Sequence, residues 1–350
     1  RVKPGMAVYF TTLGSHEEAA PRRWTGRVRQ VLPAPPGGDG KGSGMAAPAA
    51  TKAVAYTVLF DVDNSDGELM PQMTAQARFI TAQGAVPGIQ IGHAGRKASA
   101  NNPWEGDDHI AEGDARGWQP IAPSAIAFGG GLPRVPRAMT LEDIARVQGD
   151  FVAAARRALA AGFEWLELHF AHGYLAQSFF SPHSNQRDDA WGGSIENRVR
   201  LVCEVVQAVT AAIGAGRVGL RISPVSPANG IHDSAPQPLF EHLLRCLAPL
   251  GLAYIHVIEG ATGGPRSLPE QPFDYAALKA AYRSAGGQGL WMVNNGYTRE
   301  MALEAVASGY ADMVAWGKDF IANPDLVERL RRDAPLNPGR RELYYGGGAE

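Results

Sequence analysis

The sequence has few cysteines and no large excess of either charge. Two cysteines, Cys203 and Cys246, occur in 350 residues, and both fall in apolar stretches with helical periodicity. We therefore expect both to be buried as small hydrophobic side chains. The lack of a disulfide framework or a CxxC metal knuckle favours a reducing, cytoplasmic setting. Because the formal net charge is only −2, the composition indicates neither a nucleic acid nor an acidic membrane as a partner.

Long apolar runs and the glycine pattern of dinucleotide-binding folds are also missing. No run approaches the roughly 20 apolar residues of a membrane helix, so we expect no membrane partner. No GxGxxG motif follows a predicted strand, which disfavours a doubly wound dinucleotide fold. Hydrophobic residues still make up 45% of the chain, which is enough for a large core in one or two domains.

The first 72 residues are predicted to form a small antiparallel β segment. The stretches "GMAVYF", "RRWTGRVRQVL" and "AVAYTVLFDVD" alternate apolar and polar residues and are rich in Val, Tyr and Phe, as strands are. A Pro/Gly/Ala/Ser-rich tract at about 33–53 is predicted to be a disordered loop. The order of strands and turns loosely resembles an SH3-like or Tudor-like small barrel, whose aromatic residues form either a core or a ligand cage.

From residue 73 onward, predicted strands and helices alternate. A clear amphipathic helix over 140–162 has Thr140 as a plausible N-cap and Gly162 as its stop. Nearly apolar strands joined by helices of this length indicate a buried parallel sheet. Six such strands are predicted, at 88–92, 164–170, 217–223, 252–258, 289–294 and 311–317.

Polar residues at the ends of these strands favour a (β/α)8 barrel of the TIM type. Active sites of such barrels are built from the carboxyl ends of several strands. An eight-stranded barrel needs two strands more than the six predicted, so either the N-terminal segment supplies them or the barrel lacks its first two. The polar residues at or just beyond the strand ends are Gln90, His93, His169, His172, Arg221 and Asn294, with Gly317 at the last.

The stretch "LELHFAHGY" at 166–174 ends a predicted strand with two histidines and a tyrosine. A metal site is disfavoured because no third protein ligand is evident. A loop with hydrogen-bonded histidines is one remaining interpretation. In the other, His169 and His172 donate hydrogen bonds to a developing oxyanion, and Tyr174 donates a proton. Further on, Arg187, Asp189 and Arg198 are predicted to tie down a polar loop by ion pairs.

Two other strand ends suggest an anionic ligand. Arg221 would be a buried charge, which requires either a carboxylate on a neighbouring strand or an electron-rich cofactor ring. The turns "VNNGYT" and "VAWGKDF" each lead from a strand into a helix through glycine, a common way of binding phosphate in the last two units of a barrel.

Residues 75–350 resemble the Old Yellow Enzyme family of FMN-dependent ene-reductases. The motifs that carry the resemblance are "GIQIGHAGRKAS", "APSAIAF", "GFEWLELHFAHGYLAQSFFSPHSNQRDDAWGGSIENRVR", "RVGLRISP" and "IANPDLVERL" with "YYGGGAE". The part before Ser184 looks like the xenobiotic reductases. The part after it looks like the N-ethylmaleimide and pentaerythritol tetranitrate reductases, and this seam suggests recombination, a chimera or engineering.

This resemblance implies FMN and NAD(P)H as cofactors and a small activated alkene (enone or maleimide) or nitro compound as substrate. Hydride would pass from NAD(P)H through the flavin to the substrate, as in other NAD(P)H-dependent flavin oxidoreductases. The implied residues are Gln90 and Arg221 for the flavin ring, Asn295, Gly296, Gly317 and Lys318 for the FMN phosphate, His169 and His172 for the substrate oxygen, Tyr174 as proton donor, and Tyr345 beside the substrate.

The chain departs from the family pattern at Lys318, where arginine is usual, and at Trp191, where tyrosine is usual. The first two strands of the family are not identifiable in the sequence. Two alternatives therefore stay open beside the ene-reductase: a member of the family with an altered flavin site, and a non-catalytic interaction protein with a degenerate flavin barrel and a Tudor-like binding module. The sequence leaves the choice between a monomer and a homodimer open.

Overall fold

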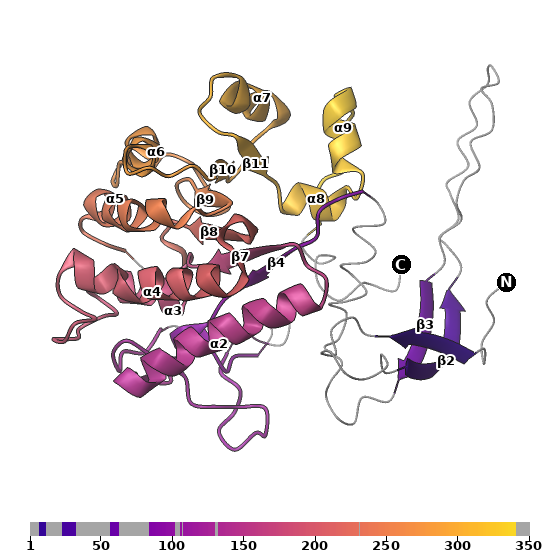
Figure 1. Cartoon of the computed structure of the whole chain (residues 1–350), viewed down its shortest axis with the longest axis horizontal. Coiled ribbons are helices and arrows are strands. Elements are labelled where there is room, and N and C mark those ends of the chain that lie inside the picture. Colours follow the sequence, from indigo (N-terminus) through magenta and orange to yellow (C-terminus); the bar gives the residue numbers. More distant parts are fainter. Residues whose placement is uncertain are drawn as a thin grey trace. The chain divides into compact units, whose positions relative to one another are not determined.

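The computed structural model describes residues 7–11, 23–32, 57–62, 84–101, 106, 108–129, 132–230 and 232–340 (Figure 1). Contacts divide the chain into two compact units, residues 1–87 with 160–162 and residues 88–159 with 163–350. The predicted boundary at 72/73, the predicted loop at 33–53 and Tyr345 lie outside the described residues.

The first unit contains a three-stranded antiparallel sheet. Its strands β1 (Ala7–Thr11), β2 (Arg23–Leu32) and β3 (Thr57–Val62) are ordered β1-β2-β3. All three lie where the alternating stretches of the sequence predicted strands, and their antiparallel pairing is confirmed. The likeness of this segment to an SH3 or Tudor barrel stays a prediction.

The second unit is built on a six-stranded sheet in which every neighbouring pair is parallel. Its order is β11-β10-β9-β8-β7-β4, so strands that follow one another along the sheet also follow one another in sequence. This is the order of a (β/α)8 barrel, and all six predicted parallel strands are confirmed. The strands are β4 (Gly88–Ile91), β7 (Trp165–His169), β8 (Val218–Ile222), β9 (Tyr254–Ile258), β10 (Leu290–Asn294) and β11 (Met313–Ala315).

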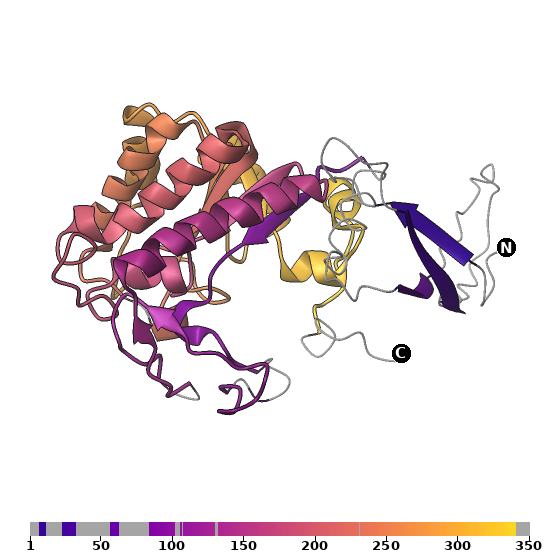
Figure 2. The same ribbon diagram turned by 60° about the horizontal axis from the view of Figure 1, so that its bottom comes forward.

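Helices connect these strands and cover one side of the sheet (Figures 1 and 2). The short helices α3 and α8 were not predicted, because five or six residues are too few to show a helical period. A two-stranded sheet of β5 (Ile121–Ala122) and β6 (Arg137–Ala138) lies between β4 and α2 in sequence. The helices are α2 (Leu141–Ala160), α3 (Leu175–Phe180), α4 (Ile195–Ile213), α5 (Pro236–Leu247), α6 (Tyr275–Ser284), α7 (Arg299–Ala307), α8 (Lys318–Ala322) and α9 (Leu326–Arg332).

The start and end of α2 confirm the signals in the sequence. The Thr140 backbone N–H donates to Asp143 Oδ2 at 2.9 Å, and the Asp143 N–H donates to Thr140 Oγ1 at 3.1 Å. These reciprocal bonds satisfy donors that the first turn of a helix leaves free. Beyond the last helical residue, Gly162 adopts a φ of 94°, a conformation that favours glycine.

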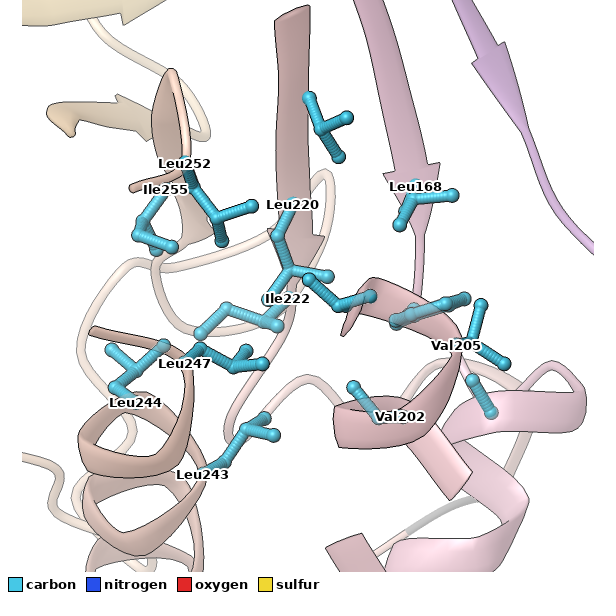
Figure 3. Close-up of a cluster of buried hydrophobic side chains, with 14 of the residues drawn as sticks. Leu168, Val202, Val205, Leu220, Ile222, Leu243, Leu244, Leu247, Leu252 and Ile255 are labelled. Atoms are coloured by element: carbon cyan, nitrogen blue, oxygen red, sulfur yellow. The ribbon is translucent and has the colours of Figure 1, made fainter. Parts of the chain in front are cut away.

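The hydrophobic core lies between the sheet and the helices. Figure 3 shows Leu168 of β7 and Leu220 and Ile222 of β8 gathered with Val202 of α4 and Leu243 of α5. Removing one such leucine side chain from water contributes about 1.5–3 kcal/mol. Because alternate strand residues point to opposite sides, the residues between these apolar ones face away from the helices. We call this other side of the six-stranded sheet the inner face.

The expectation that both cysteines are buried is wrong for Cys246. Cys203 of α4 is half-buried, whereas Cys246 of α5 is exposed. The apolar stripe of α5 that faces the sheet passes through Leu243 and Leu247. Cys246 and its neighbour Arg245 lie outside this stripe, on the part of the helix that solvent reaches.

Candidate functional site

The inner face carries polar side chains on adjacent strands. Gln90 is opposite Glu167, and His169 is opposite Arg221, which in turn is opposite His256. Neighbours in register on a parallel sheet point to the same side. The structure therefore brings together polar side chains of β4, β7, β8 and β9. Among them are Gln90, His169 and Arg221, which the sequence predicted.

Glu167 is at the centre of this group. Gln90 Nε2 donates to Glu167 Oε1 at 2.6 Å, and His256 Nδ1 lies 2.7 Å from Oε2. Burial alone would raise the pKa of Glu167, but the hydrogen bond and charge of His256, followed by Gln90 and Arg221, hold that pKa below its usual 4.5. Because an ionised carboxylate can only accept, His256 Nδ1 is the donor. The Gln90 carbonyl oxygen takes no part in this bond.

Sequence reasoning missed Glu167 and His256. Both are polar residues inside strands that are otherwise apolar, "WLELH" and "YIHVI". In the first of these, Glu167 is two residues before His169 and thus on the same face of the strand. That spacing was the available signal, but the pairing with His256 depends on the register of three strands.

His169, His172 and Tyr174 meet where β7 ends. The ring centroid of His169 lies 5.3 Å from that of His172 and 5.4 Å from that of Tyr174. Tyr174 is the residue before α3, so the strand end and the helix start fix the spacing of the rings. The predicted grouping of these three side chains is therefore present in the structure.

His172 has a backbone conformation that few L-residues adopt, with φ of 58°. Its N–H donates to Ser223 Oγ at 2.9 Å, and its carbonyl oxygen accepts from Asn229 Nδ2 at 2.5 Å. Its ring Nε2 lies 2.8 Å from Thr262 Oγ1. The loops after β8 and β9 thus hold both the backbone and the ring of His172. A residue in a strained backbone conformation persists only when such surrounding contacts fix it.

Both histidines are uncharged at neutral pH. Burial, followed by the positive charge of Arg221, lowers the pKa of His169 to about 4 and that of His172 to about 3. A neutral imidazole has one N–H donor and one acceptor nitrogen. Each ring can therefore donate a hydrogen bond to an oxygen ligand without placing a full positive charge beside Arg221.

These lowered pKa values predict loss of stability in acid. Both histidines titrate near 6.5 when unfolded, so below that pH the unfolded chain binds more protons than the folded protein. The contribution of these two histidines to the free energy of unfolding should be constant above pH 6.5. It should fall as the pH drops from 6.5 towards 4. Urea unfolding at pH 7.5 and pH 5 measures this change.

The matched variants are His172→Asn and, at an exposed position, His183→Asn. We expect His172→Asn to reduce the loss of stability between pH 7.5 and pH 5. The exposed substitution should leave that difference as it is in the unmodified protein. An equal pH dependence in His172→Asn and the unmodified protein would show that this ring is not held neutral.

Arg221 is positioned by Asn294 of β10 and by the negative charge of Glu167 on β7. Its Nη2 donates to Asn294 Oδ1 at 3.2 Å, and Asn294 Nδ2 donates in turn to the carbonyl oxygen of Ala315 at 2.7 Å. Burial lowers the pKa of Arg221, and the negative charge of Glu167 on β7 opposes that effect. Of the two predicted partners for this arginine, the carboxylate on a neighbouring strand is thus present.

The loops after β9, β10 and β11 converge at one end of the sheet. Asn295, with φ of 109°, accepts a hydrogen bond from the Gly263 N–H through Oδ1 at 3.0 Å. A Cβ atom built on Gly263 would lie 3.6 Å from Lys318 Nζ. Gly296 and Gly317 are exposed, and nothing lies within 4 Å of a Cβ built on either. The four residues predicted to bind a phosphate therefore lie on adjacent loops with open space at both glycines.

The side chain of Asn295 is already fully engaged. Its Nδ2 donates to the carbonyl oxygens of Glu259 at 2.6 Å and Ala261 at 2.8 Å. With Oδ1 bonded to Gly263, the amide shapes the loop after β9. Any contact of Asn295 with a ligand would therefore have to come from its backbone.

Three buried nitrogen atoms on or beside the inner face lack a partner among the described residues. They are His169 Nδ1, Arg221 Nε and His256 Nε2. Buried polar groups are nearly always hydrogen-bonded, and a buried donor or acceptor without a partner costs about 1–3 kcal/mol of stability. Their gathering on three adjacent strands fits a ligand with several hydrogen-bonding atoms along its edge, as an isoalloxazine ring has.

The polar loop after α3 has the structural role that the sequence predicted. Arg187 pairs with Asp189 at 2.5 Å and donates to the carbonyl oxygen of Met139 at 2.6 Å. Arg198 pairs with Asp233, and both of these side chains are buried. These contacts fix the loop, and none of them reaches the inner face.

The described ranges contain neither a cluster of metal ligands nor a membrane helix. Within the described ranges, no group of three or more His, Cys, Asp or Glu side chains could hold a metal ion. Among the helices of those same ranges, none has the length and apolar character needed to cross a membrane.

The chain is similar to flavin oxidoreductases in both sequence and structure. Residues 63–337 match the NADH:flavin oxidoreductase / NADH oxidase family. The chain is also similar to an Old Yellow Enzyme homologue from Zymomonas mobilis of known structure. That match has a TM-score of 0.67 and 32% sequence identity, and it covers 78% of this chain and 74% of that one.

Curated relatives include plant enzymes. A putative 12-oxophytodienoate reductase 11 of rice is 36% identical over 268 residues, which cover 76% of this chain and 71% of the relative. A putative 12-oxophytodienoate reductase 10 of rice is 43% identical over 211 residues, which cover 60% of this chain and 66% of the relative. The 12-oxophytodienoate reductase 2 of Arabidopsis thaliana is 36% identical over 251 residues, which cover 68% of this chain and 66% of the relative. The matched region is thus about two thirds of these relatives' length.

Proposed function

The chain belongs to the NADH:flavin oxidoreductase / NADH oxidase family, that of the Old Yellow Enzymes, and on this premise we propose that it is an FMN-dependent ene-reductase. It would use NAD(P)H as the electron donor and an enone, a maleimide or a nitro compound as the substrate. The observation that carries the proposal is the meeting of His169, His172 and Tyr174 beside Arg221, with unpaired nitrogen atoms left on the inner face.

The polar residues of the inner face suit a bound flavin ring. Bound FMN would supply the hydride chemistry, for which the protein has no side chain of its own. Because Gln90 donates its Nε2 to Glu167, its carbonyl oxygen remains to accept from an N–H on the ring edge. Arg221, with its unpaired Nε, would stabilise negative charge on the opposite edge.

The histidine and tyrosine side chains suit the substrate. We assign His169 and His172 to the substrate's carbonyl or nitro oxygen, because two neutral N–H donors polarise that group and stabilise the charge that develops on it. We assign to Tyr174 the transfer of its phenolic proton to the substrate's α-carbon. Tyr345 would lie beside the substrate. We further propose a cytoplasmic enzyme that acts as a monomer or a homodimer.

We assign the phosphate of FMN to the backbone of Asn295, Gly296 and Gly317 and to the ammonium group of Lys318. Lys318→Ala should weaken FMN binding by about tenfold, the effect of losing one charge-assisted hydrogen bond. Riboflavin, which lacks the phosphate, should bind the variant and the unmodified protein equally. Lys318→Arg should keep FMN binding, because it keeps the charge and can donate two parallel hydrogen bonds to a phosphate.

Fluorescence titration of the apo-protein with each flavin measures both affinities. An equal loss of FMN and riboflavin affinity in Lys318→Ala would contradict the phosphate assignment.

Turnover is the direct test of the proposed reaction. The purified protein should be yellow, and under anaerobic conditions it should turn over NADPH when N-ethylmaleimide or cyclohexenone is present. A colourless protein that FMN cannot reconstitute would instead favour the binding-module alternative, in which residues 1–72 act and the barrel does not catalyse. Bound FMN without alkene reduction would favour a family member with an altered site.

A further inference from the structure

The ring of His172 lies at the end of a short chain of hydroxyl groups. Its Nε2 is 2.8 Å from Thr262 Oγ1, which in turn is 2.9 Å from Ser226 Oγ. Ser226 Oγ also accepts a hydrogen bond from the Thr262 backbone N–H at 3.1 Å. Ser226 follows β8 and is buried, whereas Thr262 follows β9. The loops after two neighbouring strands thus meet the loop after β7 at one imidazole nitrogen.

Thr262 is held in place from both sides by Asn295. The Asn295 side chain donates to the carbonyl oxygen of Ala261 at 2.8 Å and accepts from the Gly263 N–H at 3.0 Å. The residues before and after Thr262 are therefore both fixed to the residue that follows β10. Together with the bond from its own N–H to Ser226, these contacts leave the Thr262 hydroxyl group little freedom to move.

The donors along this chain can be assigned one after another. Ser226 Oγ accepts from the Thr262 N–H, and among the described residues its own hydrogen finds no acceptor other than Thr262 Oγ1. Once Thr262 Oγ1 accepts that bond, its hydrogen has His172 Nε2 as the remaining partner. Hydrogen bonds that run in one direction along a chain strengthen one another. The nitrogen at the end of the chain is then the acceptor.

We propose that Thr262 and Ser226 are positioning residues that set the tautomer of His172, with the single ring proton on Nδ1. The ring is uncharged at neutral pH and so carries one N–H. The nitrogen that carries it is set by the bond that the other nitrogen makes. Within the described part of the chain, Nδ1 makes no hydrogen bond. On the premise of the proposed function, Nδ1–H is therefore the donor to the substrate oxygen.

The tautomer decides whether His172 helps or hinders the proposed reaction. With the proton on Nδ1, the ring donates to the carbonyl or nitro oxygen and stabilises the charge that develops there. With the proton on Nε2, the ring would present a bare acceptor to an oxygen that is itself an acceptor, and the two would repel. Thr262 and Ser226 thus act on the substrate through His172.

Nuclear magnetic resonance of the full chain, as purified and with isotope-labelled histidines, reads the tautomer directly. Long-range correlations between ring protons and ring nitrogens distinguish a protonated nitrogen from a bare one. The signals that disappear in His172→Asn identify this ring. We expect a protonated Nδ1 and a bare Nε2. The measurement requires neither flavin nor turnover, so its result is separate from that of the proposed function.

Thr262→Val removes the hydroxyl group and keeps the shape of the side chain, at an exposed position where a substitution costs little stability. The proton should then no longer be confined to Nδ1. Reduction of an activated alkene should slow by about tenfold, the effect of one lost hydrogen bond. Thr262→Ser, which keeps the hydroxyl group, should restore both the tautomer and the rate.

The matched control is Thr210→Val, because Thr210 Oγ1 donates to the carbonyl oxygen of Val206 within α4. It should change neither the His172 signals nor the rate. Ser226→Ala should act in the same direction as Thr262→Val, because it removes the donor that directs the Thr262 hydrogen towards the ring.

Two results would overturn the proposal: a proton on Nε2 in the unmodified protein, or His172 signals that are the same in Thr262→Val. The expected tautomer, lost in Thr262→Val, in a protein that reduces no alkene would support the role of Thr262 and Ser226. That last result would contradict the ene-reductase assignment alone.

Discussion

Replacing Tyr174 with phenylalanine is expected to slow reduction of an activated alkene by roughly 10²–10⁴-fold, the range for loss of a positioned general acid. Reduction of the bound flavin by NADPH should stay nearly unchanged. The Tyr174 hydroxyl makes no side-chain cap for α3, so the helix does not depend on it. The phenyl ring can keep its place 5.4 Å from His169. The substitution thus removes the proton and little else.

Stopped-flow spectroscopy under anaerobic conditions measures the two half-reactions separately. The matched control is Tyr282→Phe, because the Tyr282 hydroxyl on α6 accepts a hydrogen bond from the Gly289 N–H, away from the inner face. It should leave both half-reactions intact. An equal slowing of both half-reactions in Tyr174→Phe, or no slowing of either, would contradict the role of Tyr174 as proton donor.

Replacing Glu167 with leucine should have the largest effect on stability. The side chain of Glu167 is 13% exposed and accepts hydrogen bonds from Gln90 and His256. Without it, the buried His256 and the exposed Gln90 lose their acceptor and Arg221 loses the nearby negative charge. Removing one partner of a buried ionic group typically costs about 3–5 kcal/mol. We expect a loss of that size in the free energy of unfolding and weaker FMN binding, because Gln90 would no longer be oriented.

Glu167→Gln is the matched variant, because it keeps the shape and one acceptor oxygen but not the charge. Urea denaturation of the apo-proteins and FMN titration measure the two effects. The expected order of stability is unmodified protein, then Glu167→Gln, then Glu167→Leu. A Glu167→Leu protein within about 0.5 kcal/mol of the unmodified one, as for an ordinary surface substitution, would show that the carboxylate does not organise the inner face.

Much of the barrel was predictable because its strands are nearly all apolar and its helices are amphipathic. Those two patterns have different periods, so the six strands and their parallel direction could be predicted from the sequence, and the polar strand ends favoured the barrel. The meeting of His169, His172 and Tyr174 was also predictable, because six consecutive residues of one strand end and turn contain all three. The family resemblance gave these residues their proposed roles.

Other features depend on contacts between segments far apart in the sequence. The bonds that hold His172 come from Ser223, Asn229 and Thr262, and no local pattern marks these residues as its partners. The exposure of Cys246 depends on which part of α5 faces the sheet. The engagement of Asn295 with the loop after β9 likewise required the fold, because sequence motifs cannot distinguish a side chain that shapes a loop from one that binds a ligand.

Titration of the apo-protein with FMN tests most directly whether the inner face is a flavin site. We predict saturable binding of one FMN per chain, and markedly weaker binding in Arg221→Leu, which removes the guanidinium and its unpaired Nε. Absence of binding to the unmodified protein, or equal affinity in the two proteins, would contradict a flavin held by Gln90, Arg221 and their neighbours on this sheet.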